Sequence, residues 1–231
     1  MTDSLERAAT RLSSWKTWTL VPALCLAAAA LMLVVDLPVA RYCRHGDYPE
    51  FIGDALNNAE PFGHAAGVAL IVITVLALDP RAHWVAPALT VSALSGGIAA
   101  NIGKLLLSRT RPRNFDLLHG TLWETFGEWL PLLSHGARAQ SFPSAHTATA
   151  VGLAVMLCAA YPRGRWWFVT LSVLVGLHRI QTSAHYPSDV MVGAALGWWA
   201  GHLCLAGLIW AHRQHVDSEE RPTTLPLRRA V

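Results

Sequence analysis

Apolar runs long enough to cross a lipid bilayer constrain the fold of this chain more than any other feature. A crossing helix needs about 20 mostly apolar residues, with a range of about 17 to 25. The third and sixth of six candidate runs meet this requirement clearly, the first two lie near its lower limit, and polar residues interrupt the ends of the other two. In chain order the runs are Trp18–Val35, Phe62–Leu78, Trp84–Leu107, Pro143–Tyr161, Trp166–Ile180 and Val190–Ala211. The sequence therefore predicts an all-α protein with a bundle of six transmembrane helices.

The composition agrees with a membrane protein, because only 14% of the 231 residues are charged, against about 25% in a soluble domain. This length fits one domain. We expect a cytoplasmic segment over residues 1–17, the membrane domain over residues 18–211 and a disordered cytoplasmic tail over residues 212–231. The net charge is +3 and the basic residues form no stripe, so no nucleic-acid partner is expected. The oligomeric state stays open.

The loop charges predict the orientation in the inner or plasma membrane. If the N-terminus is cytoplasmic, ten lysines and arginines lie inside and eight outside. The positive-inside rule then places both termini in the cytoplasm. The two longer outer segments, residues 36–61 and 108–142, are expected to carry short helices at Glu50–Ala59 and Thr121–Leu133.

The first polar motif is Lys104-x6-Arg111-Pro112, at the outer end of the third run. Residues seven apart on a helix lie two turns apart on one face, about 10.5 Å along the axis, so both cations could reach one anion. Pro112 disfavours helical geometry at Arg111, and the helix should end there. Alternatively, both side chains extend to lipid headgroups.

The second motif runs from Ser141 to His146, at the start of the fourth run. Pro143 suits the first turn of a helix, and Ser144 can cap the free backbone amides there. Such a helix start binds anions through those amides and the helix dipole. His146 would lie beside the bound anion. The alternative is an ordinary capped helix with an incidental histidine.

The third motif, Arg179-x5-His185-x3-Asp189, joins the fifth and sixth runs. Pro187 marks a helix start, so Asp189 could accept the Nδ1 proton of His185 and leave Nε2 free. Asp189 could also serve only as an acid favoured by the helix dipole. A buried arginine costs roughly 2.5–3.5 kcal/mol near the bilayer centre, so Arg179 is expected to pair with an anion.

The three motifs should meet at one membrane surface, because successive spans alternate in direction. In this order they resemble the type 2 phosphatidic acid phosphatase superfamily, the lipid phosphate phosphatases, whose pattern is K-x6-RP, PSGH and SR-x5-H-x3-D. The resemblance covers nearly the whole chain apart from its termini. Ala145 replaces the glycine of the second motif, and His178 replaces the serine of the third.

The resemblance implies a metal-independent lipid phosphatase. His185 would attack phosphorus to form a phosphohistidine, and Asp189 would orient it. His146 would protonate the departing oxygen and then activate water. Phosphoryl transfer depends mostly on positioning and electrostatic stabilisation. The expected phosphate-binding groups are the side chains of Lys104, Arg111 and Arg179 and the amides of Ser144 and Ala145. We expect no cofactor, since the outer acids follow no metal-ligand pattern.

Four further residues are candidates for contacts with the substrate or with the catalytic groups: Asn101, Glu60, His64 and His178. A stripe of small residues in the last run, Gly193, Gly197 and Gly201, is expected to serve helix packing inside the protein.

Two other functions fit the same residues. One is a phosphotransferase that passes phosphate from His185 to another alcohol, and the other is a lipid-headgroup receptor or transporter without catalysis. The lipid phosphate substrate is also open, because several lipids carry a suitable phosphate at the membrane interface. They include phosphatidic acid, phosphatidylglycerol phosphate, an isoprenyl diphosphate and lipid A phosphate.

Overall fold

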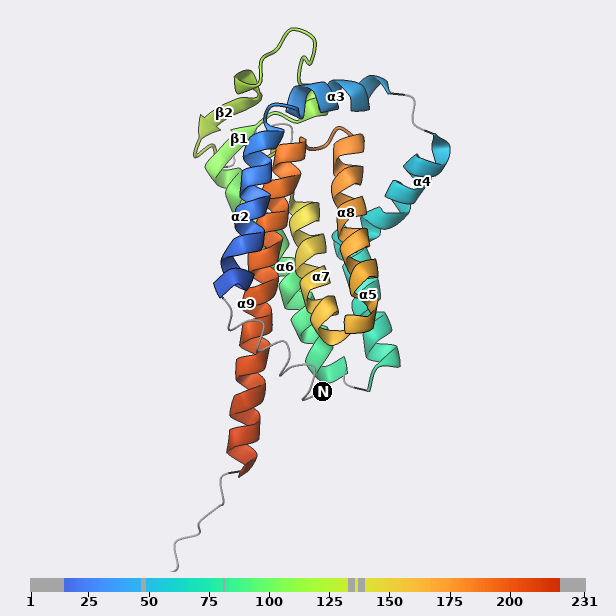
Figure 1. Ribbon diagram of the computed structural model, residues 1–231, viewed down its shortest axis with the longest axis vertical. Coiled ribbons are helices and arrows are strands. Elements are labelled where there is room, and N and C mark those ends of the chain that lie inside the picture. The colour runs from blue at the N-terminus through green and yellow to red at the C-terminus, as the bar shows by residue number, and fades with distance from the viewer. Residues whose placement is uncertain (1–14, 47–48, 81, 133–135, 137–139, 221–231) are drawn as a thin grey trace, which may run out of the picture.

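The protein is a helical bundle with its two short strands and its longest loops at one end (Figure 1). The computed structural model describes residues 15–46, 49–80, 82–132, 136 and 140–220. Each predicted apolar run coincides with one helix of the bundle. These helices are α2 (Trp15–Met32), α5 (Ala65–Leu78), α6 (Ala82–Leu106), α7 (Ala145–Ala160), α8 (Arg165–Gln181) and α9 (Pro187–Glu220).

The six-span count is not established by these helices. Among the described residues, α6 and α9 are each long and apolar enough to cross a membrane. Two bent pairs pass the same test only when each pair counts as one span: α2 with α3 (Asp36–His45) at 73°, and Glu50–Gly63 with α5 at 70°. By length and composition, the described part of the chain therefore holds two such helices, or four if each bent pair is one span, and six remains a prediction.

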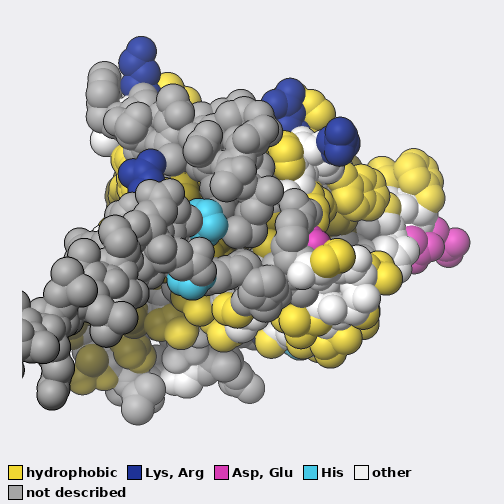
Figure 2. Space-filling view, turned by 90° about the horizontal axis from the view of Figure 1, so that it is seen from below, with side chains coloured by type: hydrophobic (Ala, Val, Ile, Leu, Met, Phe, Trp, Pro, Cys, Tyr) yellow, Lys and Arg dark blue, Asp and Glu magenta, His cyan; other side chains and the backbone are white. Residues whose placement is uncertain are grey.

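Apolar side chains cover the outside of the bundle, where a soluble protein would present polar ones. Leu31, Leu70 and Leu203 are 72%, 66% and 62% exposed. Figure 2, seen from below, shows hydrophobic side chains over much of the described surface and few charged ones. An apolar perimeter of this extent matches the hydrocarbon of a bilayer.

Helix α7 lies inside the bundle and packs against α6, α8 and α9. Leu89, Leu153, Met156 and Val175 form part of the buried core around it. The glycine stripe of α9 faces α7. A Cβ at Gly193 would lie 2.5 Å from the carbonyl oxygen of Ser144, so only glycine permits this close approach. The expectation that the stripe serves internal packing is confirmed.

Of the two loop helices that the sequence predicted, one is present and the other is not. The predicted helix Glu50–Ala59 is present as α4. The helix predicted at Thr121–Leu133 is wrong. This segment holds a short 3₁₀ helix, η3 (Trp123–Thr125), followed by strand β2 (Phe126–Trp129), which pairs antiparallel with β1 (Leu107–Arg109). Because α6 gives way to β1, the free backbone groups of β1 need a partner, and β2 supplies it. The chain is therefore mostly helical, not all-α.

The C-terminal helix extends further than predicted. Helix α9 continues to Glu220, so the disorder expected from His212 is wrong for residues 212–220. No glycine or proline interrupts this polar stretch, and its residues tolerate helical geometry. Residues 1–14 of the expected N-terminal segment and 221–231 of the expected tail lie outside the described part of the chain.

Candidate active site

The three polar motifs lie at one end of the bundle (Figure 1). Lys104 is in the last turn of α6, and His146 is in the first turn of α7. Arg179 is in the last turn of α8, and His185 comes just before α9. The alternating helix directions that the sequence predicts thus place these side chains at a common end.

Helix α6 ends earlier than the sequence suggested. It was expected to run to Arg111, but it stops at Leu106 and the chain continues as β1. Lys104 and Arg111 therefore do not share a helical face. They still approach the same place, because both charges act on His185.

The His185 ring is held by the backbone and not by the expected carboxylate. Its Nδ1 lies 2.5 Å from the carbonyl oxygen of Ser141 and 3.9 Å from Oδ2 of Asp189. A carbonyl oxygen can only accept, so Nδ1 carries the proton and Nε2 keeps its lone pair. The expected hydrogen bond to Asp189 is replaced by an indirect link: the Ser141 hydroxyl donates to Oδ2 of Asp189 at 2.6 Å.

The surroundings of His185 favour its neutral form. The side chain is buried, and this burial lowers its pKa well below the usual value. The positive charges of Arg179, Lys104 and Arg111 lower the pKa further. His185 is therefore uncharged at neutral pH and has the protonation state of a nucleophile.

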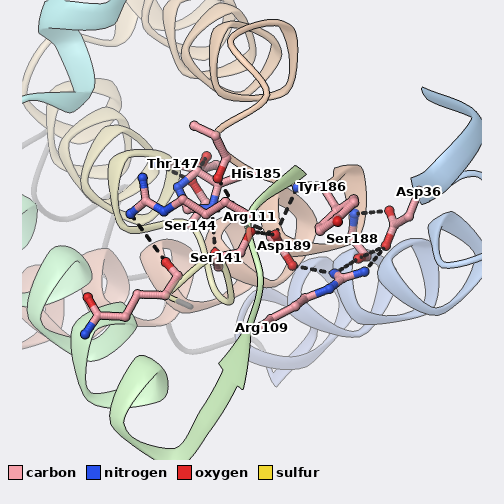
Figure 3. A network of polar contacts seen from close by, with 12 residues as sticks. Asp36, Arg109, Arg111, Ser141, Ser144, Thr147, His185, Tyr186, Ser188 and Asp189 are labelled. Carbon is pink, nitrogen blue, oxygen red and sulfur yellow. Dashed lines mark hydrogen bonds and ion pairs between the residues drawn. The ribbon is translucent and has the colours of Figure 1, made fainter. Parts of the chain in front are cut away.

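Asp189 belongs to a buried ion-pair network that includes Arg109 and Asp36 (Figure 3). Arg109 is fully buried and contacts Oδ1 of Asp189 at 2.5 Å and Oδ2 of Asp36 at 2.7 Å. Burial alone would lower the pKa of Arg109, but the carboxylates of Asp189 and Asp36 raise it. The arginine thus stays charged between two buried acids.

Two aromatic rings and a serine complete this network. The Arg109 guanidinium carbon lies 4.3 Å from the ring centre of Phe126 in β2 and 4.1 Å from that of Tyr186. Such contacts between a cation and a ring face are attractive. Ser188 donates its backbone amide to Asp36 at 3.0 Å, which caps the start of α9. The network therefore fixes the helix start that carries Asp189.

The network was missed because its members are distant in sequence and lie outside the three motifs. Asp36 is 73 residues from Arg109, so no local spacing joins them. Arg109 lies between Lys104 and Arg111, where it counted only as a positive charge of an outer loop. The available signal was the position of Asp36 and Arg109 next to apolar runs, because a charged side chain that becomes buried there needs a partner.

Two cationic side chains of the site retain free donors. The Nε atoms of Arg111 and Arg179 are buried and have no hydrogen-bond partner within the described part of the chain. A terminal nitrogen of Arg111 donates to the Gln140 carbonyl at 3.5 Å. Figure 3 shows Arg111 beside His185. Planar guanidinium groups with free donors suit a phosphate, which accepts two hydrogen bonds from each.

The start of α7 supplies fewer amides than expected. Ser144 is the N-cap, and its hydroxyl accepts from the Thr147 amide at 3.4 Å. The Ser144 amide, however, donates to the Asp189 carbonyl at 3.1 Å and is not free for phosphate. This bond ties the starts of α7 and α9 together. The amides of Ala145 and His146 remain, since the first turn of a helix has no internal acceptors for them.

His146 faces an acid on the neighbouring segment η1 (Glu60–Gly63). Its Nε2 lies 3.5 Å from Oε1 of Glu60, and its ring centre lies 5.7 Å from that of His64. His64 also caps α5 by accepting from the Ala66 amide at 3.3 Å. Glu60 and His64 thus lie beside a catalytic candidate. The buried His178 of α8 also acts on His146 electrostatically, whereas Asn101 is exposed on α6.

The described residues include no group of three or more histidine, cysteine, aspartate or glutamate side chains suited to hold a metal ion. The acids of this region are engaged by arginine, serine and histidine instead. Its charge pattern suits an oxyanion held by cationic side chains and amides.

Comparison with known proteins agrees with this geometry. Residues 84–213 match the family model of the PAP2 superfamily. A lipid A 1-phosphatase of Rhizobium etli is 28% identical over 191 residues, which cover 75% of this chain and 77% of that protein. A lipid A 1-phosphatase of Rhizobium johnstonii is 33% identical over 116 residues, or 50% of this chain and 45% of that protein.

A solved structure shares the fold. The crystal structure of Aquifex aeolicus LpxE matches with a TM-score of 0.57 at 20% identity, covering 74% of this chain and 95% of that chain. The family match spans more than half of the chain and includes all three motifs. This chain therefore belongs to the PAP2 superfamily and is a lipid phosphatase built on membrane-spanning helices.

Proposed function

We propose that this protein removes a terminal phosphate from a lipid through a phosphohistidine on His185, without a metal ion. The observation that carries the proposal is the state of the His185 ring. Its Nδ1 proton is committed to the Ser141 carbonyl, and its pKa is lowered by burial and by three cations. A neutral imidazole with a free Nε2 beside anion-binding side chains is an activated nucleophile.

The reaction has two steps. In the first, Nε2 of His185 bonds to phosphorus as the bond from phosphorus to the lipid oxygen breaks, and the imidazolium of His146 gives its proton to that oxygen. In the second, neutral His146 takes a proton from water as the water oxygen attacks phosphorus, and the bond to His185 breaks. Lys104, Arg111, Arg179 and the Ala145 amide stabilise the phosphoryl oxygens in both steps.

A lipid substrate is supported by an apolar cavity next to the site. The cavity measures about 840 Å³ and lies between α2, α7, α8 and α9. Thr147 lines it and also contacts the Ser144 hydroxyl at 2.9 Å. The cavity therefore begins next to the helix start that faces phosphate, which suits an acyl chain attached to a bound headgroup.

Lipid A 1-phosphate is the first substrate to test, because the relatives compared above carry that activity in their names. We place the site at the outer face of the inner or plasma membrane, with both termini in the cytoplasm. The sequence supports this orientation, because the segments expected inside hold ten lysines and arginines and the segments expected outside hold eight.

The test is a phosphate-release assay of the purified protein with a labelled lipid panel. The panel contains lipid A, phosphatidic acid, phosphatidylglycerol phosphate and undecaprenyl diphosphate. We expect free phosphate from at least one lipid and, after rapid quenching, a labelled phosphoenzyme that maps to His185. Transfer of the label to an added alcohol instead of water would indicate a phosphotransferase. Binding without phosphoenzyme or product would contradict catalysis altogether.

Chelation should leave the activity intact. We expect phosphate release to stay within about twofold after incubation with EDTA, since side-chain cations perform the charge stabilisation that a metal would otherwise supply. The measurement is the initial rate before and after chelation, with a known Mg²⁺-dependent phosphatase as control. Complete loss that Mg²⁺ restores would overturn the metal-free mechanism.

A further inference from the structure

We infer that Glu60 is a positioning residue that keeps His146 protonated for the first step of the reaction. This inference rests on the proposed function. Oε1 of Glu60 lies 3.5 Å from Nε2 of His146 and 3.9 Å from a terminal nitrogen of Arg179. One carboxylate thus lies beside both the proposed acid and a phosphate-binding cation. Glu60 also lies outside residues 84–213, which match the family.

The segment that carries Glu60 is fixed tightly against the catalytic helix. A Cβ on Gly63 would lie 2.7 Å from the His146 carbonyl oxygen and 2.7 Å from a methyl group of Val175, so η1 contacts α7 and α8 directly. Phe62 is buried, and His64 caps the helix that follows. The Glu60 side chain is 29% exposed and the His146 side chain 28%. This partial burial strengthens the interaction between their charges relative to water.

The charges around His146 show why an acid is needed. Arg179 and His178 face it from α8, Lys104 from α6 and His64 from the start of α5. Burial of the His146 ring opposes its proton most, and the positive charges of these groups oppose it further. Among the described residues, Glu60 is the acid within salt-bridge distance of His146. Its negative charge acts against these effects and favours the proton that His146 needs in order to act as an acid.

The alternative is that Glu60 merely pairs with Arg179 and stabilises the site. The two roles differ in their dependence on the leaving group. An alkoxide needs a proton as it departs, whereas a nitrophenolate departs without one. If Glu60 acts through His146, its loss should harm only the substrate with the alkoxide. A purely structural residue should affect both substrates equally.

The experiment compares Glu60→Gln with the wild type on two substrates of equal chain length, dodecyl phosphate and 4-dodecyl-2-nitrophenyl phosphate. We expect kcat/KM for dodecyl phosphate to fall about tenfold or more at pH 7. In the pH profile of kcat/KM for dodecyl phosphate, the fall in activity at alkaline pH should begin about one unit lower, as expected when an opposite charge is removed from beside a histidine. For the nitrophenyl ester, kcat/KM should stay within about threefold. Glu50→Gln, an exposed acid on α4, is the matched control and should behave as wild type.

Equal losses on both substrates, or an unmoved alkaline limb, would overturn the role of Glu60. Should Glu60→Gln fail to fold, Glu60→Asp provides the second test. It keeps the charge but withdraws the carboxylate by one methylene, so any loss that it causes must again fall on dodecyl phosphate and spare the nitrophenyl ester. The wild type provides the separate check. If it forms no phosphoenzyme with either ester or with the lipid panel, the proposed function itself fails, and the Glu60 inference fails with it.

Discussion

The His185→Ala variant is expected to lose phosphate release on the order of 10⁴-fold or more, the scale seen when a nucleophile is removed. Nε2 of His185 forms the covalent bond to phosphorus in the proposed mechanism, and alanine has no group that could replace it. The measurement is kcat on the best lipid of the panel, together with the rapid-quench assay, which should show no phosphoenzyme.

Phosphate binding should survive the His185→Ala substitution. This result would distinguish the loss of the chemical step from the loss of the folded site. Lys104, Arg111 and Arg179 remain in His185→Ala, so competition by inorganic phosphate should change by no more than about threefold. Arg111→Ala is the contrasting variant and should weaken this competition by about tenfold or more, because a charged hydrogen-bond donor contributes about 1.5–3 kcal/mol. Residual turnover within tenfold of wild type would exclude His185 as the nucleophile.

The Arg109→Met variant should lose about 3–5 kcal/mol of unfolding free energy, the typical cost of removing one partner from a buried ion pair. The side chains of Arg109, Asp36 and Asp189 are all 0% exposed. Methionine fills much of the same volume but leaves two buried carboxylates without a counter-charge. Activity should fall with stability, because Asp189 positions Ser141, whose carbonyl holds the His185 ring.

The control for this prediction is Arg163→Met, which removes an exposed arginine at the opposite end of the bundle and should cost less than about 0.5 kcal/mol. The double variant Arg109→Met with Asp36→Asn should recover part of the loss, because it removes one of the stranded charges. Thermal or denaturant unfolding in detergent measures all of these variants. If Arg109→Met unfolds like Arg163→Met, the network does not stabilise the fold.

The parts of the fold that the sequence predicted well are local ones. Pro187 and the cap at Ser144 marked their helix starts, because capping depends on a few neighbouring residues. The apolar runs located the helices, since each helix satisfies its own backbone. The missed strand β2 depends on pairing with β1, and Gly127 and the residues around it carry no local signal for that pairing.

Contacts between residues distant in the sequence also explain what was missed in the site. The spacing of His185 and Asp189 suggested a direct hydrogen bond. The Asp189 carboxylate instead pairs with Arg109, which lies 80 residues earlier in the sequence. The position of Ser141 within its motif gave no indication that its carbonyl would hold the histidine ring. A contact of Glu60 and His64 with the substrate or the catalytic groups was only a hypothesis, based on their position at the beginning of the second apolar run on the expected outer side.

Asp36 has a practical consequence for how this protein can be divided. The family model matches from residue 84, and a truncation designed from that match alone would start there. Such a fragment would lack the acid that balances Arg109 and caps α9. A piece that folds with an intact catalytic centre must therefore include Asp36 at the beginning of α3.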